Sequence, residues 1–370
     1  MAALHGQRIT LTELGRALPS QARVKHNIKR VDRLLGNVQL CAERFGIYQA
    51  IARWLLGQAR QPIIVVDWSD LTADRSWQLL RAAVVLGGRT LTLYEEVHPL
   101  RHFANRRVHR VFLRQLATLL PTGTTPILIT DAGFRAPWFK AVSSLGWHWI
   151  GRVRHLDYVR AQGSPTWVGC KSLYVNANAR AQALGGYEIV RSNSVCCSLY
   201  LVKRAKKNRV NKSVFGKRVR SSQSLKQARA QREPWLLAAS PSLAAFPATD
   251  IVNFYTMRMQ IEEAFRDLKS DRYGLGFELN LSRTRERIAT LLLIAALALF
   301  VLWHIGRAAI NQGLQFQYQS NTRRNRPVIS VLYLACLLLR HPTYASPPRV
   351  FSMPLPLRYG SLPVATFNPV

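Results

Sequence analysis

Three acidic residues in separate parts of the chain have the surroundings of metal ligands. Asp67 follows the apolar run IIVV, Asp131 follows ILIT, and Glu262 lies in the stretch YTMRMQIEEAFRDLK. Reactive side chains of α/β proteins collect at strand ends, although an Asp there also commonly caps a turn or a helix. Carboxylates from separate segments suit hard divalent cations. Two such ions, about 3.5–4 Å apart, activate a water or a 3′-hydroxyl for attack on a phosphodiester.

The helical spacing around Glu262 distinguishes it from its neighbour Glu263. At about 100° per residue, one stripe of the predicted helix, beside a broad apolar face, holds five residues: Tyr255, Arg258, Glu262, Arg266 and Lys269. Helical ion pairing explains one or two of these cations. A tyrosine and three cations around one acid favour a site that also holds phosphate oxygens. We therefore predict Glu262 as the third ligand and its stripe neighbours as DNA contacts, with Glu263 off the site.

Other catalytic patterns are missing from the sequence. It contains no HExxH metalloprotease motif, no P-loop and no nucleophile elbow. The five cysteines show no CxxC spacing, so neither a zinc site nor a disulfide framework is indicated, and a reducing compartment fits. The first residues lack the apolar core of a secretory signal, which predicts a cytoplasmic protein.

The chain carries a strong positive charge. It holds 52 Lys and Arg against 19 Asp and Glu, a formal net charge of +33 over 370 residues. An excess of this size repels itself unless a polyanion is near. The composition therefore favours nucleic acid over a membrane surface as the partner. Hydrophobic residues make up 48% of the chain, which argues against a disordered protein.

One apolar segment admits a second interpretation. Residues 288–303, IATLLLIAALALFVLW, carry no charge, but the run is shorter than the roughly 20 residues that a membrane-spanning helix needs. We interpret it as a helix buried inside a large domain, with no membrane partner. A membrane protein anchored by this run is the alternative.

The elements that must position the acids begin with helices and continue with a sheet. Residues 1–57 are predicted to form a helical DNA-binding region, in which Thr10 and Glu13 make a capping box. In residues 58–156, strands alternate with helices, which predicts the first part of an α/β catalytic domain with a mixed sheet and flanking helices. A hairpin is expected to turn at Gly87 and Gly88.

The second half of the chain changes pattern three times. Residues 157–248 are predicted to form a β-rich insertion with the strands GYEIV, CCSLYLV and PWLLAAS. A basic loop within it, from Lys203 to Arg232, holds twelve Lys or Arg and no acidic residue. Residues 249–312 return to helix, including one from Thr249 to about Tyr273, and complete the catalytic domain. Residues 313–370 predict a C-terminal helical region and a tail with seven prolines.

The spacing around Glu262 resembles the signature of the DDE transposases of the bacterial insertion sequence four family, in particular the insertion sequence ten subgroup. That signature is Tyr, two residues, Arg, three residues, Glu, six residues and Lys. Four residues match it at every position: Tyr255, Arg258, Glu262 and Lys269. The segments VDWSD at Asp67, TDAGF at Asp131, LTELGRALP and KHNIKRVDRLLGN also look like that subgroup, so the resemblance covers roughly residues 9–340.

The resemblance implies a fold and an active site. The fold would be an RNase H-like domain with a β-rich insertion between the second Asp and the Glu. The metal-binding residues would be Asp67, Asp131 and Glu262, holding two Mg²⁺ ions, for which Mn²⁺ can substitute. The residues that grip phosphates at the element end would be Tyr255, Arg258 and Lys269.

The resemblance also implies a reaction and its partners. Hydrolysis frees a 3′-hydroxyl, this attacks the opposite strand to make a hairpin, and the reopened end is joined to target DNA. The expected partners are double-stranded DNA with terminal inverted repeats, target DNA and a second copy of the chain in a homodimer. The family uses a tryptophan of the insertion to stack a flipped base, and Trp235 is similar to it in position, with a core tryptophan on a strand as the alternative.

Two departures from the family keep a second function open. The family usually begins further upstream, so part of its N-terminal end-recognition region is expected to be absent. The proline-rich tail after His341 does not resemble the family's C-terminus. The alternative function is a catalytically inactive, transposase-derived DNA-binding protein.

Overall fold

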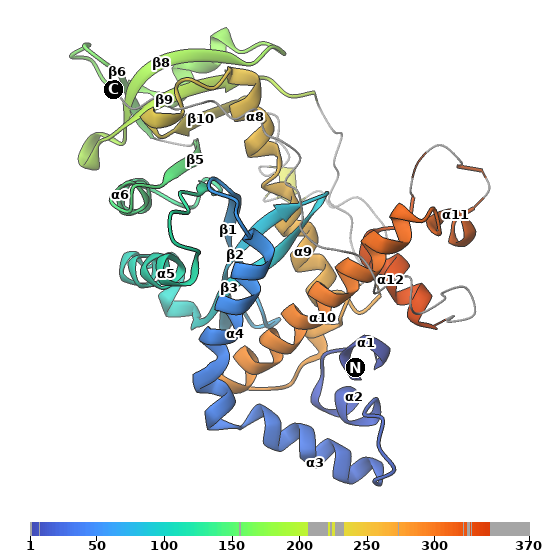
Figure 1. Ribbon diagram of the computed structural model, residues 1–370. Helices are drawn as coiled ribbons and strands as arrows, with labels where there is room; N and C mark the ends of the chain where they lie inside the picture. Colours follow the sequence, from blue (N-terminus) through green and yellow to red (C-terminus); the bar gives the residue numbers. More distant parts are fainter. Residues whose placement is uncertain are drawn as a thin grey trace.

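One ten-stranded sheet runs from the middle of the protein, where β1, β2 and β3 lie, to its upper end in Figure 1, where β6, β8 and β9 lie. The computed structural model describes residues 2–340 except 7, 155–156, 206–220, 223, 226–232, 273, 321, 324–325 and 327. The strand order is β3-β2-β1-β4-β5-β10-β9-β8-β6-β7. Strand β4 pairs in parallel with β1 and β5, and the other pairs are antiparallel. The mixed sheet predicted from the alternation of strands and helices is therefore present.

The first five strands make the part of the sheet that carries the two aspartates. Their bounds are β1 Ile63–Asp70, β2 Trp77–Leu86, β3 Arg89–Pro99, β4 Ile127–Ile129 and β5 His148–Val153. The hairpin between β2 and β3 turns at Gly87 and Gly88, as predicted, and both residues have positive φ angles of 55° and 90°, which glycine adopts without steric strain. Strand β5 was not among the predicted strands.

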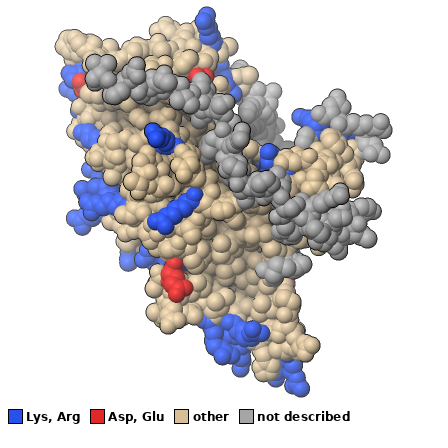
Figure 2. Space-filling view, viewed as in Figure 1, with Lys and Arg blue, Asp and Glu red and all other residues tan. Residues whose placement is uncertain are grey.

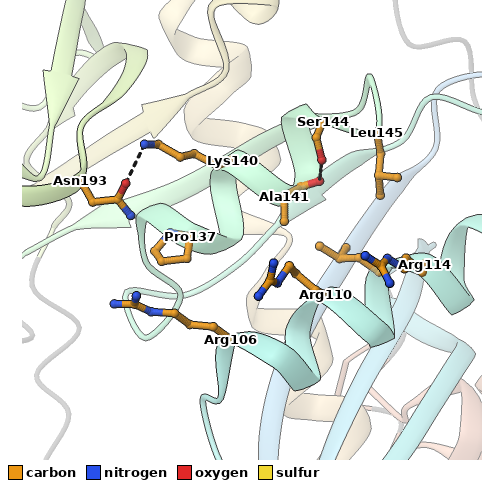
Figure 3. A pocket seen from close by; sticks show the side chains of 10 residues that line it. Arg106, Arg110, Arg114, Pro137, Lys140, Ala141, Ser144, Leu145 and Asn193 are labelled. Carbon is orange, nitrogen blue, oxygen red and sulfur yellow. Dashed lines mark hydrogen bonds between the residues drawn. The ribbon is translucent and has the colours of Figure 1, made fainter.

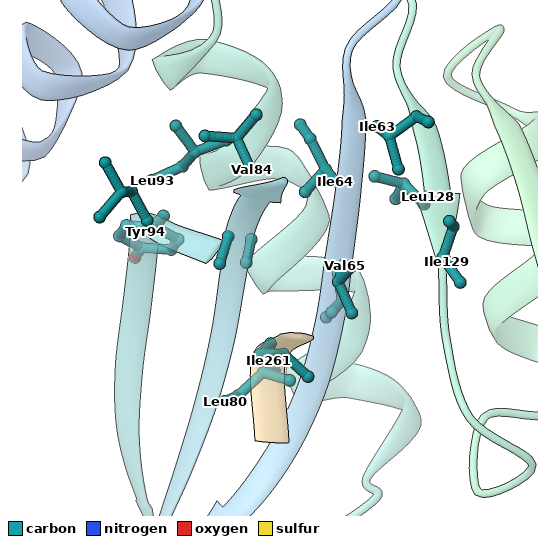
Figure 4. Packing of buried hydrophobic residues seen from close by; sticks show 14 of the residues in the cluster. Ile63, Ile64, Val65, Leu80, Val84, Leu93, Tyr94, Leu128, Ile129 and Ile261 are labelled. Atoms are coloured by element: carbon teal, nitrogen blue, oxygen red, sulfur yellow. The ribbon is translucent and has the colours of Figure 1, made fainter. Parts of the chain in front are cut away.

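Helices cover this part of the sheet. Two follow β3 and β4, namely α5 Arg106–Leu119 and α6 Ala136–Ser143, and two come from the segment around Glu262, namely α8 Ala248–Thr256 and α9 Met259–Lys269. Figure 4 shows Ile261 of α9 beside Leu80 and Val65 of the sheet. All three side chains have 0% exposure, so apolar packing fixes α9 on β1, which carries Asp67, and on its neighbour β2.

The insertion continues the same sheet instead of forming a separate one. Its strands are β6 Tyr158–Ala161, β7 Val168–Gly169, β8 Gln182–Ile189, β9 Val195–Val202 and β10 Trp235–Ala239. Strand β10 pairs with β5 on one side and with β9 on the other. The strand-rich character predicted for this interval is present. Most of the predicted basic loop, residues 206–220 and 226–232, lies outside the described residues.

Helices at both ends of the chain pack against each other. The N-terminal helices are α1 Ala2–Gly6, α2 Leu11–Arg16, α3 Val24–Leu35 and α4 Val38–Leu56; the C-terminal helices are α10 Arg285–Asn311, α11 Gln315–Tyr318 and α12 Val331–Arg340. Helix α10 contacts α1, α3, α4 and α12. The short 3₁₀ helices are Leu100–His102, Cys170–Asn176, Arg191–Asn193, Pro241–Leu243 and Phe277–Leu279. The predicted proline-rich tail lies outside the described residues.

Helix α10 contains the uncharged run that raised the membrane alternative. At 27 residues it is longer than predicted, and by length and composition it could cross a membrane. However, 72% of its most apolar window is buried inside the protein. Gly306 allows α12 to approach closely, because a Cβ at this position would clash with the backbone carbonyl of Val331. The helix thus forms part of the core, as we predicted for this run.

Two further predictions about local structure were wrong. Strand β1 does not end at Asp67 but continues to Asp70, because residues 67–70 keep pairing with β2. The single helix predicted from Thr249 is two helices. Between them the amides of Met257 and Arg258 bond to the carbonyls three residues earlier, which is the tighter 3₁₀ pattern.

Candidate active site

The two aspartates come to the same level of two adjacent parallel strands, Asp67 within β1 and Asp131 just after β4. In the β1–β4 pair, Val65 is opposite Ile129, and two residues further along the chain come Asp67 and Asp131. Side chains two residues apart on a strand point to the same face. The register of this pair therefore brings Asp67 and Asp131 to neighbouring positions, although β4 itself ends at Ile129.

Asp67 is held from two sides. Its Oδ1 accepts a hydrogen bond of 2.8 Å from the backbone amide of Trp68, and its Oδ2 accepts one of 3.2 Å from Arg258. The pKa of this carboxyl is raised from 3.8 to about 7, first by burial and then by the negative charge of Asp131, against the opposing effect of Arg258. Glu262 raises it further, by a smaller amount. Negative charge is therefore concentrated at this point of the sheet.

Asp131 is oriented by the loop that follows β4. Its Oδ1 accepts a hydrogen bond of 2.8 Å from the backbone amide of Gly133. A Cβ at position 133 would lie 3.0 Å from this same oxygen, closer than ordinary side-chain contacts. The absence of a side chain at Gly133 thus allows the Asp131 carboxylate to fold back on the loop.

Arg258 joins Glu262 to Asp67. One guanidinium nitrogen lies 3.2 Å from Asp67 Oδ2, and the other lies 2.6 Å from Glu262 Oε1. Burial opposes the charge of this guanidinium, but Tyr255, Asp67 and Glu262 together raise its pKa. The Glu262 side chain is 46% exposed. One arginine cation therefore bridges the acid of α9 and the acid of β1.

The side chains of Asp67, Asp131 and Glu262 are not arranged to coordinate one metal ion together. Across residues 2–340, within the part that the structure describes, no group of three or more His, Cys, Asp or Glu side chains could hold one ion. The aspartates are neighbours, but Glu262 reaches Asp67 through the Arg258 guanidinium. All three acids offer oxygen ligands, the donors that Mg²⁺ and Mn²⁺ prefer. Direct contact of one ion with Asp67 and Glu262 would require that guanidinium to move.

Tyr255 and Trp235 form an aromatic pair beside the acids. Their rings meet edge to face with centroids 5.2 Å apart, and Tyr255 is buried, which raises the pKa of its hydroxyl. The guanidinium carbons of Arg152 and Arg204 lie 5.9 Å and 5.4 Å from the centre of the Trp235 ring. Trp235 is half-buried, so it is neither a fully enclosed core residue nor a free platform.

The predicted ring of cations around Glu262 was wrong for two of its three members. Arg266 pairs with Glu263, its neighbour one helical turn earlier. The negative charge of Asp70 acts to raise the pKa of Lys269, and the Lys269 Nζ lies 5.8 Å from the centre of the Phe265 ring. Burial lowers the pKa of the Lys269 amine. Because Glu262, Arg266 and Lys269 lie on the same helix α9, the difference is one of side-chain direction. Arg258, one helical turn before Glu262, is the cation that pairs with it.

A buried charged row next to Asp67 was missed in the sequence. Asp67 is opposite Arg81 on β2, and Arg81 is opposite Glu95 on β3. Arg81 and Glu95 form an ion pair of 2.7 Å with side chains 1% and 2% exposed, and the Tyr48 hydroxyl donates a 2.8 Å hydrogen bond to Glu95. A single arginine inside the apolar strand WQLLRAAVVL was the available signal, since a buried charge needs a partner.

His109 was also missed, and it contacts Trp68, the residue that follows Asp67. Its Nε2 lies 3.0 Å from the indole nitrogen of Trp68, which donates a hydrogen bond to it. The ring of His109 stacks on Phe134 with centroids 5.0 Å apart. Burial lowers the pKa of His109 to about 4, so the ring is neutral and can accept this bond. Helix α5 is thereby tied to the residue that follows Asp67.

Comparison with known families identifies the chain. The family model described as a transposase DDE domain matches residues 58–301, more than half of the 370 residues. The matched range includes Asp67, Asp131 and Glu262. Comparison with the curated proteins gives no match. The chain belongs to the transposase DDE domain family.

Proposed function

We propose that this protein is a cut-and-paste DNA transposase of the insertion sequence four family and its insertion sequence ten subgroup. It would cleave the ends of its element through a hairpin intermediate and join them to target DNA by metal-dependent phosphoryl transfer. The observation that carries the proposal is that Asp67 on β1 and Asp131, two residues after the end of β4, come to neighbouring positions because β1 and β4 pair in parallel. The mixed sheet with β1 at the centre of its first part supports an RNase H-like fold.

The metal ligands in this proposal are the three acids. Asp67, Asp131 and Glu262 would hold two Mg²⁺ or Mn²⁺ ions, and the raised pKa of Asp67 supports the fit, because crowded carboxylates are stabilised by a cation. Bound ions would supply an activated hydroxyl and stabilise the charge that develops on the phosphate. The ions would also replace the positive charge that Arg258 contributes between Asp67 and Glu262.

The protein's own cations and aromatic rings would then position the DNA. Arg258 would turn from the two acids to the phosphate next to the cut, where a guanidinium can bind two oxygens at once. Tyr255 and Lys269 would hold neighbouring phosphates, and Arg266 lies on the exposed side of α9 as a further contact. Trp235 would stack on a flipped base after Arg152 or Arg204 leaves its ring.

The proposed partners are double-stranded DNA and a second copy of the chain. The element's terminal inverted repeats and the target DNA would be bound by a homodimer in the cytoplasm. The net charge of +33 supports a polyanionic partner, because contacts with phosphates provide a large share of the affinity of DNA-binding proteins.

A supercoiled plasmid that carries the element with its flanking DNA tests this proposal. Excised linear DNA and hairpin ends should appear only when Mg²⁺ or Mn²⁺ is present. Asp67→Asn, Asp131→Asn and Glu262→Gln should each reduce nicking at least about a hundredfold and leave DNA binding intact. Glu263→Gln is the matched control, with the same charge change one residue away, and should nick nearly as well as wild type. Equal loss in Glu262→Gln and Glu263→Gln would exclude Glu262 as the ligand.

The second candidate function is a DNA-binding protein that no longer cuts. The bridge from Arg258 to both Asp67 and Glu262 favours it, because an arginine that stayed in place would keep one ion from contacting both acids. This candidate predicts a gel shift with the plasmid's end fragments and no nicking at any Mg²⁺ or Mn²⁺ concentration.

A further inference from the structure

A groove with a basic lining runs between helices α5 and α6, away from the three acids. It has a volume of about 430 Å³, and its lining includes Arg106, Arg110 and Arg114 of α5 and Lys140 of α6. Figure 3 shows the α5 arginines and the α6 side chains on opposite sides of this space. None of the residues proposed for the active site lines it. The groove is therefore a second site, separate from the catalytic one.

The three arginines form a regular row. They follow one another at intervals of four residues, which is about 6 Å along a helix, so the row is about 12 Å long. They are exposed, and within the described residues they make no ion pair and no acid lines the groove. Lys140 donates a 2.6 Å hydrogen bond to Asn193 of the insertion, which places a further cation at one end. In Figure 2, Lys and Arg side chains gather on the edge of the molecule where Figure 1 shows α5.

The opposite face of α5 fixes this row relative to the active site. Phe112 and Leu116 are buried at 0% exposure, and His109 accepts the hydrogen bond from Trp68, the residue after Asp67. The arginine row therefore lies on a helix whose position is set by the same strand that carries the first catalytic acid.

We propose that this groove binds the backbone of duplex DNA outside the base pairs that are cut. Each DNA strand presents one phosphate per about 3.4 Å along the helix axis, so a 12 Å row spans about three or four phosphates. Guanidinium groups bind phosphate oxygens in pairs, and contacts to phosphates carry no sequence information. The groove binds any duplex equally, and it rests on the proposed function only in taking DNA as the partner.

The salt dependence of DNA binding tests the groove without requiring cleavage. Binding of two duplexes of about 30 base pairs and unrelated sequence is measured in EDTA across a salt series. Each phosphate contact contributes about 0.9 to the slope of log K against log salt. Arg110→Gln should lower the slope by about 0.9, and the triple variant of Arg106, Arg110 and Arg114 to Gln by about 2.7. The loss should be the same for both duplexes.

Arg107→Gln is the matched control, because Arg107 is an exposed arginine of the same helix that does not line the groove. It should leave the slope unchanged, and circular dichroism should show that all variants keep the wild-type helix content. An unchanged slope in the triple variant, a loss confined to one duplex, or an equal loss in Arg107→Gln would overturn the groove proposal. A wild type that shows the expected slopes but nicks no plasmid would instead overturn the cleavage proposal alone.

Discussion

At the scale of single residues, the site is defined by crowded like charges and one arginine. Asp67 is buried next to Asp131, and Arg258 supplies the nearest opposing charge. Because a carboxylate in such surroundings retains its proton to a higher pH, protonation would compete with the proposed metal binding for the same oxygens. The pH scale of this competition is set by the pKa of about 7 at Asp67.

Mn²⁺ affinity should therefore rise with pH. Below pH 7 an ion must displace the proton of Asp67, so binding measured by titration calorimetry should strengthen about tenfold per pH unit from pH 5 to 7 and then level off.

The raised pKa of Asp67 also affects the stability of the metal-free protein. Between about pH 4 and 7 the folded state holds a proton on Asp67 that the unfolded chain has released, so the free energy of unfolding should fall as the pH rises through this range. Asp67→Asn should flatten both profiles. A wild-type affinity independent of pH would contradict the assignment.

Sequence patterns predicted part of the site and could not predict the rest. The apolar runs before Asp67 and Asp131 were enough to expect two buried strands, because both runs have the length and composition of such strands, but they did not show that the two strands are neighbours. The partner of Arg266 could not be chosen from spacing, because Glu262 and Glu263 both lie one helical turn before it. The surroundings of Lys269 include Asp70 of β1, which is distant in the sequence. The bridge from Arg258 to Asp67 joins residues 191 positions apart, which no local pattern records.

At the scale of helices and strands, buried contacts fix the geometry of the site. The Arg81–Glu95 ion pair lies in the same register as Asp67, and the guanidinium carbon of Arg81 lies 5.3 Å from the centre of the Phe265 ring on α9. This pair thus connects β1, β2 and β3 with the helix that carries Glu262. We expect removal of the Arg81–Glu95 ion pair to lower the stability of the fold more than it changes the reaction directly.

Arg81→Met should lower the free energy of unfolding by about 3–5 kcal/mol, because it leaves the Glu95 charge buried without its partner. Urea denaturation monitored by circular dichroism measures this change. The double variant Arg81→Met with Glu95→Gln removes both charges and retains an acceptor for the Tyr48 hydroxyl, so it should recover most of the loss. A double variant as unstable as Arg81→Met alone would show that packing, not the unpaired charge, dominates.

Two glycines in helices should respond oppositely to alanine. Gly306→Ala places a methyl group against the backbone of Val331 and should destabilise the α10–α12 contact by about 1–3 kcal/mol. Gly46→Ala in α4 meets no atom within 4 Å and should stabilise its helix by about 0.5–1 kcal/mol. Thermal unfolding of the two variants should shift in opposite directions. Stabilisation by Gly306→Ala would contradict the close approach of the two helices.

The elements themselves were predictable to different degrees. The helices between residues 9 and 57, the hairpin at Gly87 and Gly88 and the buried helix α10 follow local hydrophobic patterns and glycine positions, and these were predicted. Strand β5 has no clear alternation, and the pairing of β10 with β5 joins segments about ninety residues apart. Pairing at this separation depends on the whole fold, so the continuous sheet was not foreseen.

At the scale of the whole molecule, positive charge is the dominant property. With a net charge of +33, the folded chain repels itself, and this repulsion is screened by salt or cancelled by a polyanion. The melting temperature should therefore rise by several degrees as NaCl increases from about 0.05 to 0.5 M, where the Debye length falls several-fold. Differential scanning fluorimetry measures this shift. Sucrose controls for general stabilisation, and a melting temperature insensitive to salt would show that the charges are too dispersed to matter.

The pairing of β10 with β5 has a mechanical consequence. Trp235 begins β10, and backbone hydrogen bonds join this strand on one side to β5, the neighbour of the strand that precedes Asp131. A hinge movement of the insertion relative to the rest of the sheet would require the backbone hydrogen bonds between β10 and β5 to break. In the proposed reaction this part of the protein would keep its position, and the bending that brings a terminal base to Trp235 would have to come from the DNA. Element ends with easily kinked base steps would then be cut fastest.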